Sequence, residues 1–236
     1  MQIPEAVRTL ERELREVFGK RIQSLVVYGH SGGVRPSPIS TLALVDTLTP
    51  DDLRSCAVRT AGWHALGLAT PLLIAASEFG QSFDAFPLEF GAIVADHTVV
   101  AGTDAFAGLR VDTADLRRAC EVKARGHLLH LREGYLEAHG RSDAVAELIG
   151  DSAAALAALL RTVAHLLGGN LGDADSAARL VEQELHVDDG TFREIVSLAG
   201  AAPPTSEQAR QLFPRYLHAV ERLTTHVDRW NKPDAQ

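Results

Sequence analysis

The stretch that decides the fold is Ser24–Val45, SLVVYGHSGGVRPSPISTLALV. It opens with the apolar run Leu25–Tyr28, passes through a glycine-rich segment that begins at Gly29, and ends in a second apolar run, Leu42–Val45. Short apolar runs on either side of a glycine-rich segment are typical of two buried strands joined by a turn. The sequence therefore predicts an α/β domain organised around these two strands.

The same stretch resembles the nucleotidyltransferase superfamily of DNA polymerase β and of the kanamycin-type antibiotic nucleotidyltransferases. In that superfamily an apolar strand ends in Gly-Ser, the nucleotide phosphates lie over this turn, and an Asp-x-Asp pair follows on the next strand. Gly29 matches the family glycine, and His30 takes the place of the serine. When Arg35-Pro36 is aligned with the Arg-Pro that often precedes the acidic pair, Ile39 and Thr41 take the places of the two aspartates.

The missing aspartates bear directly on activity. The resemblance implies that these acids hold two Mg²⁺ ions, which bind a triphosphate and activate the attacking hydroxyl, and neither isoleucine nor threonine offers an anionic oxygen ligand. We therefore expect no catalytic residues, no metal site and no cofactor. Backbone N–H groups of a glycine turn can still form an anion-binding concavity, although such turns also occur without a ligand. The expected phosphate-binding residues are Gly29, His30, Ser31, Gly32 and Gly33.

Composition indicates a folded, soluble protein with an acidic surface. The 236 residues are 46% hydrophobic and 23% charged, and the net charge is −8. Because no basic stripe is evident, broad binding to nucleic acid is not expected. No run approaches the roughly 18 apolar residues that span a bilayer, and the polar amino terminus does not resemble a signal peptide, so we expect no membrane association and a cytoplasmic location. Cys56 and Cys120 are predicted to be small buried hydrophobic residues.

A second resemblance lies in residues 86–102, FPLEFGAIVADHTVVAG. The pattern is similar to that of a group of bacterial proteins described as predicted nucleotidyltransferases, which often carry an acid three places after the glutamate. Here the glutamate is Glu89 and the third place is Ala92. We expect an apolar strand that ends near Asp96, with Glu89 as a weak catalytic candidate or as a structural partner for an arginine or a backbone group.

Beyond a linker at residues 102–110, the chain changes to long helices. Caps and apolar spacing predict helices that open near Asp112, Ser142 and Thr205, the last one kinked or divided at Pro214, and a cap at Thr49 predicts another helix in the first part of the chain. The sequence thus predicts a nucleotidyltransferase-like domain with a mixed β-sheet and flanking helices over residues 1–110, followed by a helical bundle over residues 111–236. The resemblance implies the same arrangement, as in the antibiotic-modifying relatives.

Three functions remain open. The leading hypothesis is a catalytically degenerate nucleotidyltransferase-like protein, a pseudoenzyme that binds a nucleotide or another small ligand, or acts as an interaction module. The alternative is an active enzyme that transfers a nucleotidyl group from an NTP to a small molecule or protein. It would use Mg²⁺ and non-standard acids from the set Asp46, Asp84, Glu89 and Asp96. The third is a structural homodimer joined through the helical bundle, which an apolar patch on the last helix would favour.

Another short pattern points to different chemistry. Arg125 and His130 form an Arg-x4-His spacing that resembles the motif of HEPN ribonucleases. Five helical residues span about 140° around the axis, so the two side chains do not share one face. A chance occurrence explains this pattern better than a ribonuclease does.

Overall fold

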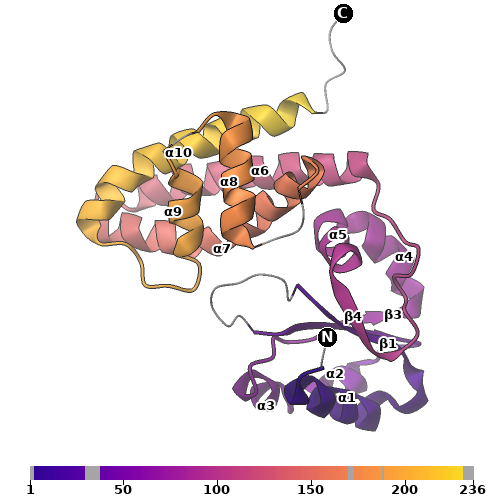
Figure 1. Cartoon of the computed structure of the whole chain (residues 1–236). Coiled ribbons are helices and arrows are strands. Elements are labelled where there is room, and N and C mark those ends of the chain that lie inside the picture. Colours follow the sequence, from indigo (N-terminus) through magenta and orange to yellow (C-terminus); the bar gives the residue numbers. More distant parts are fainter. Residues whose placement is uncertain (1–2, 30–37, 170–172, 188, 231–236) are drawn as a thin grey trace, which may run out of the picture. The chain divides into compact units, whose positions relative to one another are not determined.

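The computed structural model describes residues 3–29, 38–169, 173–187 and 189–230. The chain divides into two compact units, residues 1–111 and 112–236. The first unit contains the β-sheet and the second is helical (Figure 1). No helix in the described ranges is both long and apolar enough to cross a membrane.

A four-stranded mixed sheet forms the centre of the first unit, in the spatial order β3-β2-β1-β4. Its strands are β1 (Ile22–Tyr28), β2 (Ser40–Val45), β3 (Leu72–Ala75) and β4 (His97–Gly102). β1 pairs antiparallel with both β2 and β4, whereas β2 pairs parallel with β3. The two apolar runs of the deciding stretch are therefore the two central strands, and the predicted mixed sheet is confirmed.

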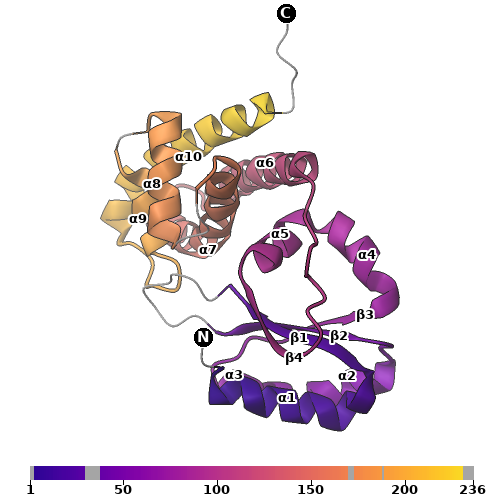
Figure 2. The same ribbon diagram turned by 45° about the vertical axis from the view of Figure 1, so that its right-hand side comes forward.

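Helices cover both faces of this sheet, as the rotated view in Figure 2 shows. On one face lie α1 (Glu5–Phe18), α2 (Pro50–Ala57) and α3 (Thr60–Ala65). On the other lie α4 (Ala76–Ala85) and α5 (Pro87–Ala95). Because successive strand residues point to opposite faces, each strand contributes to two separate cores. The α1-side core takes Leu25, Val27, Ala43 and Val45, and the α5-side core takes Val26, Leu42 and Leu44.

A partly buried ion pair joins α2 to the residue that precedes β1. The short 3-10 turn Gly19–Arg21 ends at Arg21, whose guanidinium donates to both carboxylate oxygens of Asp52 at 2.8 and 2.7 Å. Asp52 also completes the predicted cap, because it accepts from Thr49 N–H while its own N–H donates to Thr49 Oγ1. The Arg21 guanidinium holds the pKa of the Asp52 carboxyl well below its usual range. Asp52 is only 7% exposed, so its charge depends on this partner.

One predicted strand is wrong. Residues 87–95 form helix α5, and the strand β4 begins only at His97, after Asp96. Pro87 starts the helix at its first position, where a missing N–H costs nothing, and Phe90 and Ile93 are buried one turn apart. A short apolar run does not distinguish a buried strand from a buried helix by periodicity, which explains the error.

The described residues of the second unit form five helices: α6 (Thr113–Glu137), α7 (Ser142–Leu166), α8 (Ala174–Leu185), α9 (Thr191–Ser197) and α10 (Ser206–Arg229). The predicted caps at Asp112 and Thr205 are confirmed, each accepting hydrogen bonds from the first turn of its helix. Of the two predicted effects of Pro214, a kink or a division of the last helix, the division is wrong, since α10 continues through this residue.

A polar network joins three of these helices. His127 of α6 lies 2.6 Å from the hydroxyl of Tyr216 of α10, which lies 3.0 Å from Ser152 Oγ of α7. Burial lowers the pKa of His127 to about 4, so the imidazole is neutral at pH 7. Cys56 and Cys120 are both buried and free, as predicted.

Candidate functional site

The carboxyl end of β1 is where the sequence places a phosphate site. Gly29 follows the strand directly, and its φ of 68° lies in the left-handed region that favours glycine. Its N–H donates to the carbonyl oxygen of Asp96 at 3.3 Å, which extends the β1–β4 pairing by one residue. The predicted residues His30, Ser31, Gly32 and Gly33 lie outside the described residues, so phosphate binding by this turn stays a prediction.

Ile39, the first of the two aligned acid positions, is part of the sheet. Its N–H donates to Gly67 at 2.8 Å, its carbonyl accepts from Ala69 at 2.9 Å, and it forms a parallel bridge with Leu68. The half-buried side chain packs against the α1-side core. An apolar residue at this position therefore contributes to the packing of the domain.

Thr41, the second aligned position, is more deeply enclosed. It shares its face of β2 with Ala43 and Val45, which belong to the α1-side core. The residue is only 1% exposed, and its hydroxyl has no hydrogen-bond partner among the described residues. A carboxylate here would lie beside the apolar side chains of the α1-side core, where a charge is costly unless a cation or hydrogen-bond donor compensates it.

At the same end of β1 and β2, the face of the sheet on the α5 side carries polar groups. Tyr28 pairs with Ser40 across β1 and β2, and their side chains are hydrogen-bonded. Burial raises the pKa of Tyr28, and the negative charge of Glu89 adds to the shift. Tyr28, Ser40 and Glu89 therefore lie together at the Gly29 end of the sheet, on the α5 side.

Glu89 and Ala92 lie on α5, where the sequence predicted a strand. Both are exposed and stand one helical turn apart, so they share a face of the helix. Ala92 also accepts the N–H of Asp96 through its carbonyl at 3.1 Å, which ends the helix. The weak candidate Glu89 is thus a solvent-facing carboxylate close to Tyr28.

Of the other acids considered for an active enzyme, Asp46 and Asp84 lie away from this edge, whereas Asp96 lies beside Gly29, whose N–H its carbonyl accepts. Asp46 follows the far end of β2, where its N–H donates to Arg21 and its carboxylate accepts from Gln23. Asp84 is an exposed residue near the end of α4. Within the described ranges, no three His, Cys, Asp or Glu side chains lie close enough to hold a metal ion.

His97, at the start of β4, has a structural role. His97 opens β4, with Nδ1 2.8 Å from the carbonyl of Ile93 and Nε2 3.1 Å from Asp104 Oδ1. Asp104 also accepts from Phe106 N–H, and this bond is the main cause of its lowered pKa. Both ring nitrogens of His97 are therefore engaged in holding α5 and the turn after β4 together.

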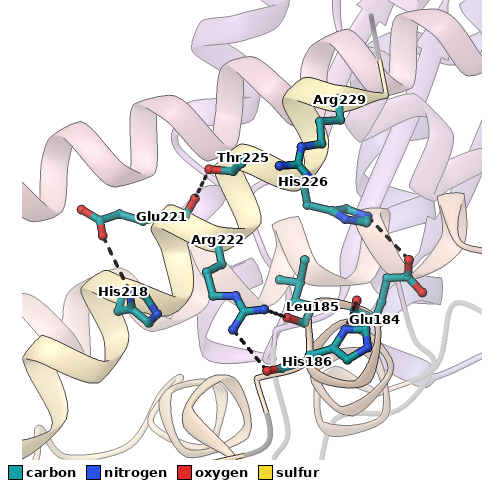
Figure 3. A pocket seen from close by; sticks show the side chains of 9 residues that line it. All are labelled: Glu184, Leu185, His186, His218, Glu221, Arg222, Thr225, His226 and Arg229. Carbon is teal, nitrogen blue, oxygen red and sulfur yellow. Dashed lines mark hydrogen bonds and ion pairs between the residues drawn. The ribbon is translucent and has the colours of Figure 1, made fainter. Parts of the chain in front are cut away.

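Sequence reasoning missed a hollow in the helical unit, between the outer face of α10 and the end of α8 (Figure 3). It has a volume of about 440 Å³. From α10 it is lined by residues that recur at three or four positions, a spacing visible in the sequence: His218, Arg222, Thr225, His226 and Arg229.

The ribonuclease pattern is not assembled either. Arg125 is bound to Glu121 at 3.0 Å and to Asp228 of α10 at 2.5 Å. The side chain of His130 is 83% exposed and lies 3.5 Å from Glu133. Arg125 therefore joins α6 to α10, whereas His130 pairs with a different residue, Glu133.

Comparison with known proteins supports the fold. No protein-family model matches the chain, and no curated protein is significantly similar to it in sequence. A similar solved structure is that of the spectinomycin adenyltransferase AAD(9) from Enterococcus faecialis with ATP and spectinomycin. The match has 12% sequence identity and a TM-score of 0.58, and it covers 93% of this chain and 98% of that chain. The chain therefore has the polymerase β-like nucleotidyltransferase fold, including the helical region, which confirms the expected resemblance.

Proposed function

We propose that this chain is a nucleotidyltransferase-fold protein that binds a nucleotide or another small ligand without transferring a nucleotidyl group. The observation that carries the proposal is Thr41, which is 1% exposed and packed into the α1-side core where the alignment expects a metal-binding acid. Two-metal catalysis requires several anionic oxygens converging on the ions. In the described part of the chain no three His, Cys, Asp or Glu side chains lie close enough to hold a metal ion, which supports the proposal.

The polar edge beside Gly29 is the proposed ligand site. Tyr28 and Ser40 supply hydroxyl groups, and Glu89 supplies an exposed carboxylate. These groups can hydrogen-bond a ribose or another polyol, and the glycine turn would receive the phosphates if the ligand is a nucleotide. An active enzyme would instead need Mg²⁺ bound with the NTP, held by acids such as Glu89 and Asp96.

A nucleotidyl-transfer assay tests the catalytic half of the proposal. The purified chain would be incubated with each labelled ribonucleoside triphosphate and Mg²⁺, with and without amino-alcohol acceptors, spectinomycin among them because the similar structure contains it. We expect no labelled product. Labelled product that forms with the wild-type chain but not with Glu89→Ala would establish nucleotidyl-transfer activity and overturn the proposal.

Thermal unfolding with the same nucleotides tests the binding half. A ligand at one hundred times its Kd raises the unfolding free energy by about 2.7 kcal/mol, which is a visible shift. We expect one nucleotide to stabilise the chain without a requirement for Mg²⁺, and Tyr28→Phe to reduce the shift. If none of the four stabilises it, nucleotide binding is excluded and a ligand of another class must be sought.

A second candidate function, self-association, is favoured by the outer face of α6. Three apolar residues recur there every seven positions: Val122, Leu129 and Leu136 are 68%, 56% and 73% exposed. This face lies opposite the buried residues of the helix, such as Cys120 and Leu128. Gly126 lies between the exposed residues with open space around it. A glycine in the middle of a helix costs about 1 kcal/mol relative to alanine. Among the described residues of the helical unit, the exposed large apolar side chains lie on α6 rather than on the last helix, α10.

The symmetric spacing of these apolar residues points to a second copy of the chain as the occupant. In an antiparallel pair centred on Leu129, Val122 faces Leu136 of the other copy. Arg125 and Arg132 flank the same face, but each is neutralised within its own chain, by Asp228 at 2.5 Å and Glu221 at 2.8 Å. We expect such a dimer to be joined by apolar contacts.

Sedimentation equilibrium distinguishes this dimer from a monomer. Leu129→Glu should dissociate it, whereas Val58→Glu, at an 80% exposed valine of the first unit, should not. A wild-type chain that stays monomeric at high concentration would exclude this function.

A further inference from the structure

The hollow between α8 and α10 gathers titratable nitrogen. Two arginines and three histidines line it, together with two glutamates. The histidines are His186, His218 and His226, out of ten in the sequence. With neutral histidines the two arginines balance the two glutamates, whereas the whole sequence carries a net charge of −8 on the same count, so the hollow is less negative than the chain as a whole.

Arg222 is held in place before any ligand arrives. Its guanidinium donates to the carbonyl oxygens of His186, at 3.2 Å, and Leu185, which are the last carbonyls of α8 (Figure 3). A cation at a helix carboxyl terminus is favourable because the helix dipole places partial negative charge there. A guanidinium has five N–H donors, so this anchoring fixes its position and leaves donors for a ligand.

Arg229 lies on the same face of α10, seven residues further along. It makes no hydrogen bond or ion pair with any described residue. Burial lowers the pKa of the neighbouring His226; the charge of Glu184 opposes this shift and the charge of Arg229 adds to it. Two helical turns separate it from Arg222, about 10 Å along the axis. The two guanidiniums can therefore reach opposite ends of one small molecule in the hollow.

Each carboxylate of the lining lies near one of its histidines. Glu221 is bound to Arg132, outside the hollow, at 2.8 Å and lies 4.0 Å from His218 Nδ1. Glu184 lies 4.0 Å from His226 Nε2, too far for a hydrogen bond. His226 Nε2 is a buried atom without a hydrogen-bond partner in the described chain. Unpaired buried nitrogen is costly, and a ligand that accepts a hydrogen bond from it would remove that cost.

We propose that this hollow binds a small polyvalent anion of the phosphate or diphosphate class. Guanidinium groups match phosphate oxygens with paired N–H donors, and imidazole side chains can add further donors. A volume of about 440 Å³ leaves room for an organic group beside the phosphate. A divalent cation is not the occupant, because no three metal-ligating side chains of the described residues converge there. This site is separate from the polar edge beside Gly29.

Isothermal titration calorimetry of the full chain with inorganic pyrophosphate, without Mg²⁺, tests the proposal. Arg229→Gln should weaken binding at least about tenfold, because it removes a charge-assisted contact, and Arg229→Glu should abolish it. Both variants should fold normally, since Arg229 is exposed and makes no described contact. Arg118→Gln, at an arginine that is 71% exposed outside the hollow, should bind like wild type.

The outcomes separate this site from the proposed nucleotide site. If Arg229→Gln loses pyrophosphate binding and keeps the thermal shift with a nucleotide, the chain has two independent sites. Pyrophosphate binding that is unchanged in Arg229→Glu, or absent in wild type, overturns the proposal. Equal weakening by Arg229→Gln and Arg118→Gln would also overturn it, because that result indicates general charge attraction alone.

Discussion

The two faces of the sheet differ most at the end where β1 and β2 meet the glycine turn. On the α1 side, Ile39 and Thr41 extend an apolar core, and the Thr41 hydroxyl has no hydrogen-bond partner among the described residues. On the α5 side, Tyr28 and Ser40 hydrogen-bond each other near the exposed Glu89. At this end the sheet therefore has polar groups on its α5 side and a buried, mostly apolar core on its α1 side. Placing an acid at each aligned position in turn measures how far the faces differ.

The largest effect is expected at Thr41. Thr41→Asp places a carboxyl group in an apolar core without a partner, which should lower the free energy of unfolding by about 3–5 kcal/mol. Urea unfolding followed by circular dichroism measures this loss. Thr41→Val is the matched control, and because it removes an unpaired buried hydroxyl it should leave stability within about 1 kcal/mol of wild type or raise it. A Thr41→Asp variant as stable as wild type would show that this face is open to water.

The acid that the α1 side does contain should be the next most sensitive. Asp52→Asn removes the charge that pairs with Arg21 and should cost about 2–3 kcal/mol, whereas Asp51→Asn, whose side chain is 80% exposed, should cost less than about 0.5 kcal/mol. The pKa of Asp52 is lowered in the folded state, so its contribution is complete above pH 5 and is lost as pH falls below about 4. The difference between wild type and Asp52→Asn should therefore shrink between pH 5 and pH 2. A constant difference would mean that the ion pair does not stabilise the fold.

Ile39→Asp is expected to have a smaller effect than Thr41→Asp. The residue is half-buried, so the new carboxylate can stay partly hydrated, and its backbone bonds to Gly67 and Ala69 are retained. We expect a loss of about 2 kcal/mol, compared with about 0.5–1 kcal/mol for Ile39→Val. Thermal unfolding of the two variants side by side checks this order. A larger loss than that of Thr41→Asp would reverse the assignment of the more enclosed position.

How much of this could be predicted depends on the residue pattern. Two strands around Gly29 followed from apolar runs bounded by turn residues, and the caps at Thr49, Asp112 and Thr205 followed from local chemistry. The helix of residues 87–95 did not, because its apolar run lacks a clear period. The face occupied by Thr41 was also hidden, because β2 is buried on both faces and its residues do not alternate between polar and apolar. The structure assigns the faces through the cross-strand pairs. Thr41 pairs with Val27 on the α1 side, and Ser40 pairs with Tyr28 on the α5 side.

The smallest effect is expected at Ala92, the third aligned position, because it is exposed on α5. Ala92→Asp places a carboxylate one turn from Glu89 and one turn from Asp96, so like charges at helical spacing should cost only about 0.5 kcal/mol. Because exposed charges are screened, this cost should largely disappear at about 1 M salt, whereas the cost of Thr41→Asp should remain. Urea unfolding at low and high salt gives both numbers, with Ala92→Ser as the uncharged control. If salt relieved both variants equally, the α1 side would be as hydrated as the α5 side, and the buried Thr41 would no longer explain why a metal-binding acid is missing.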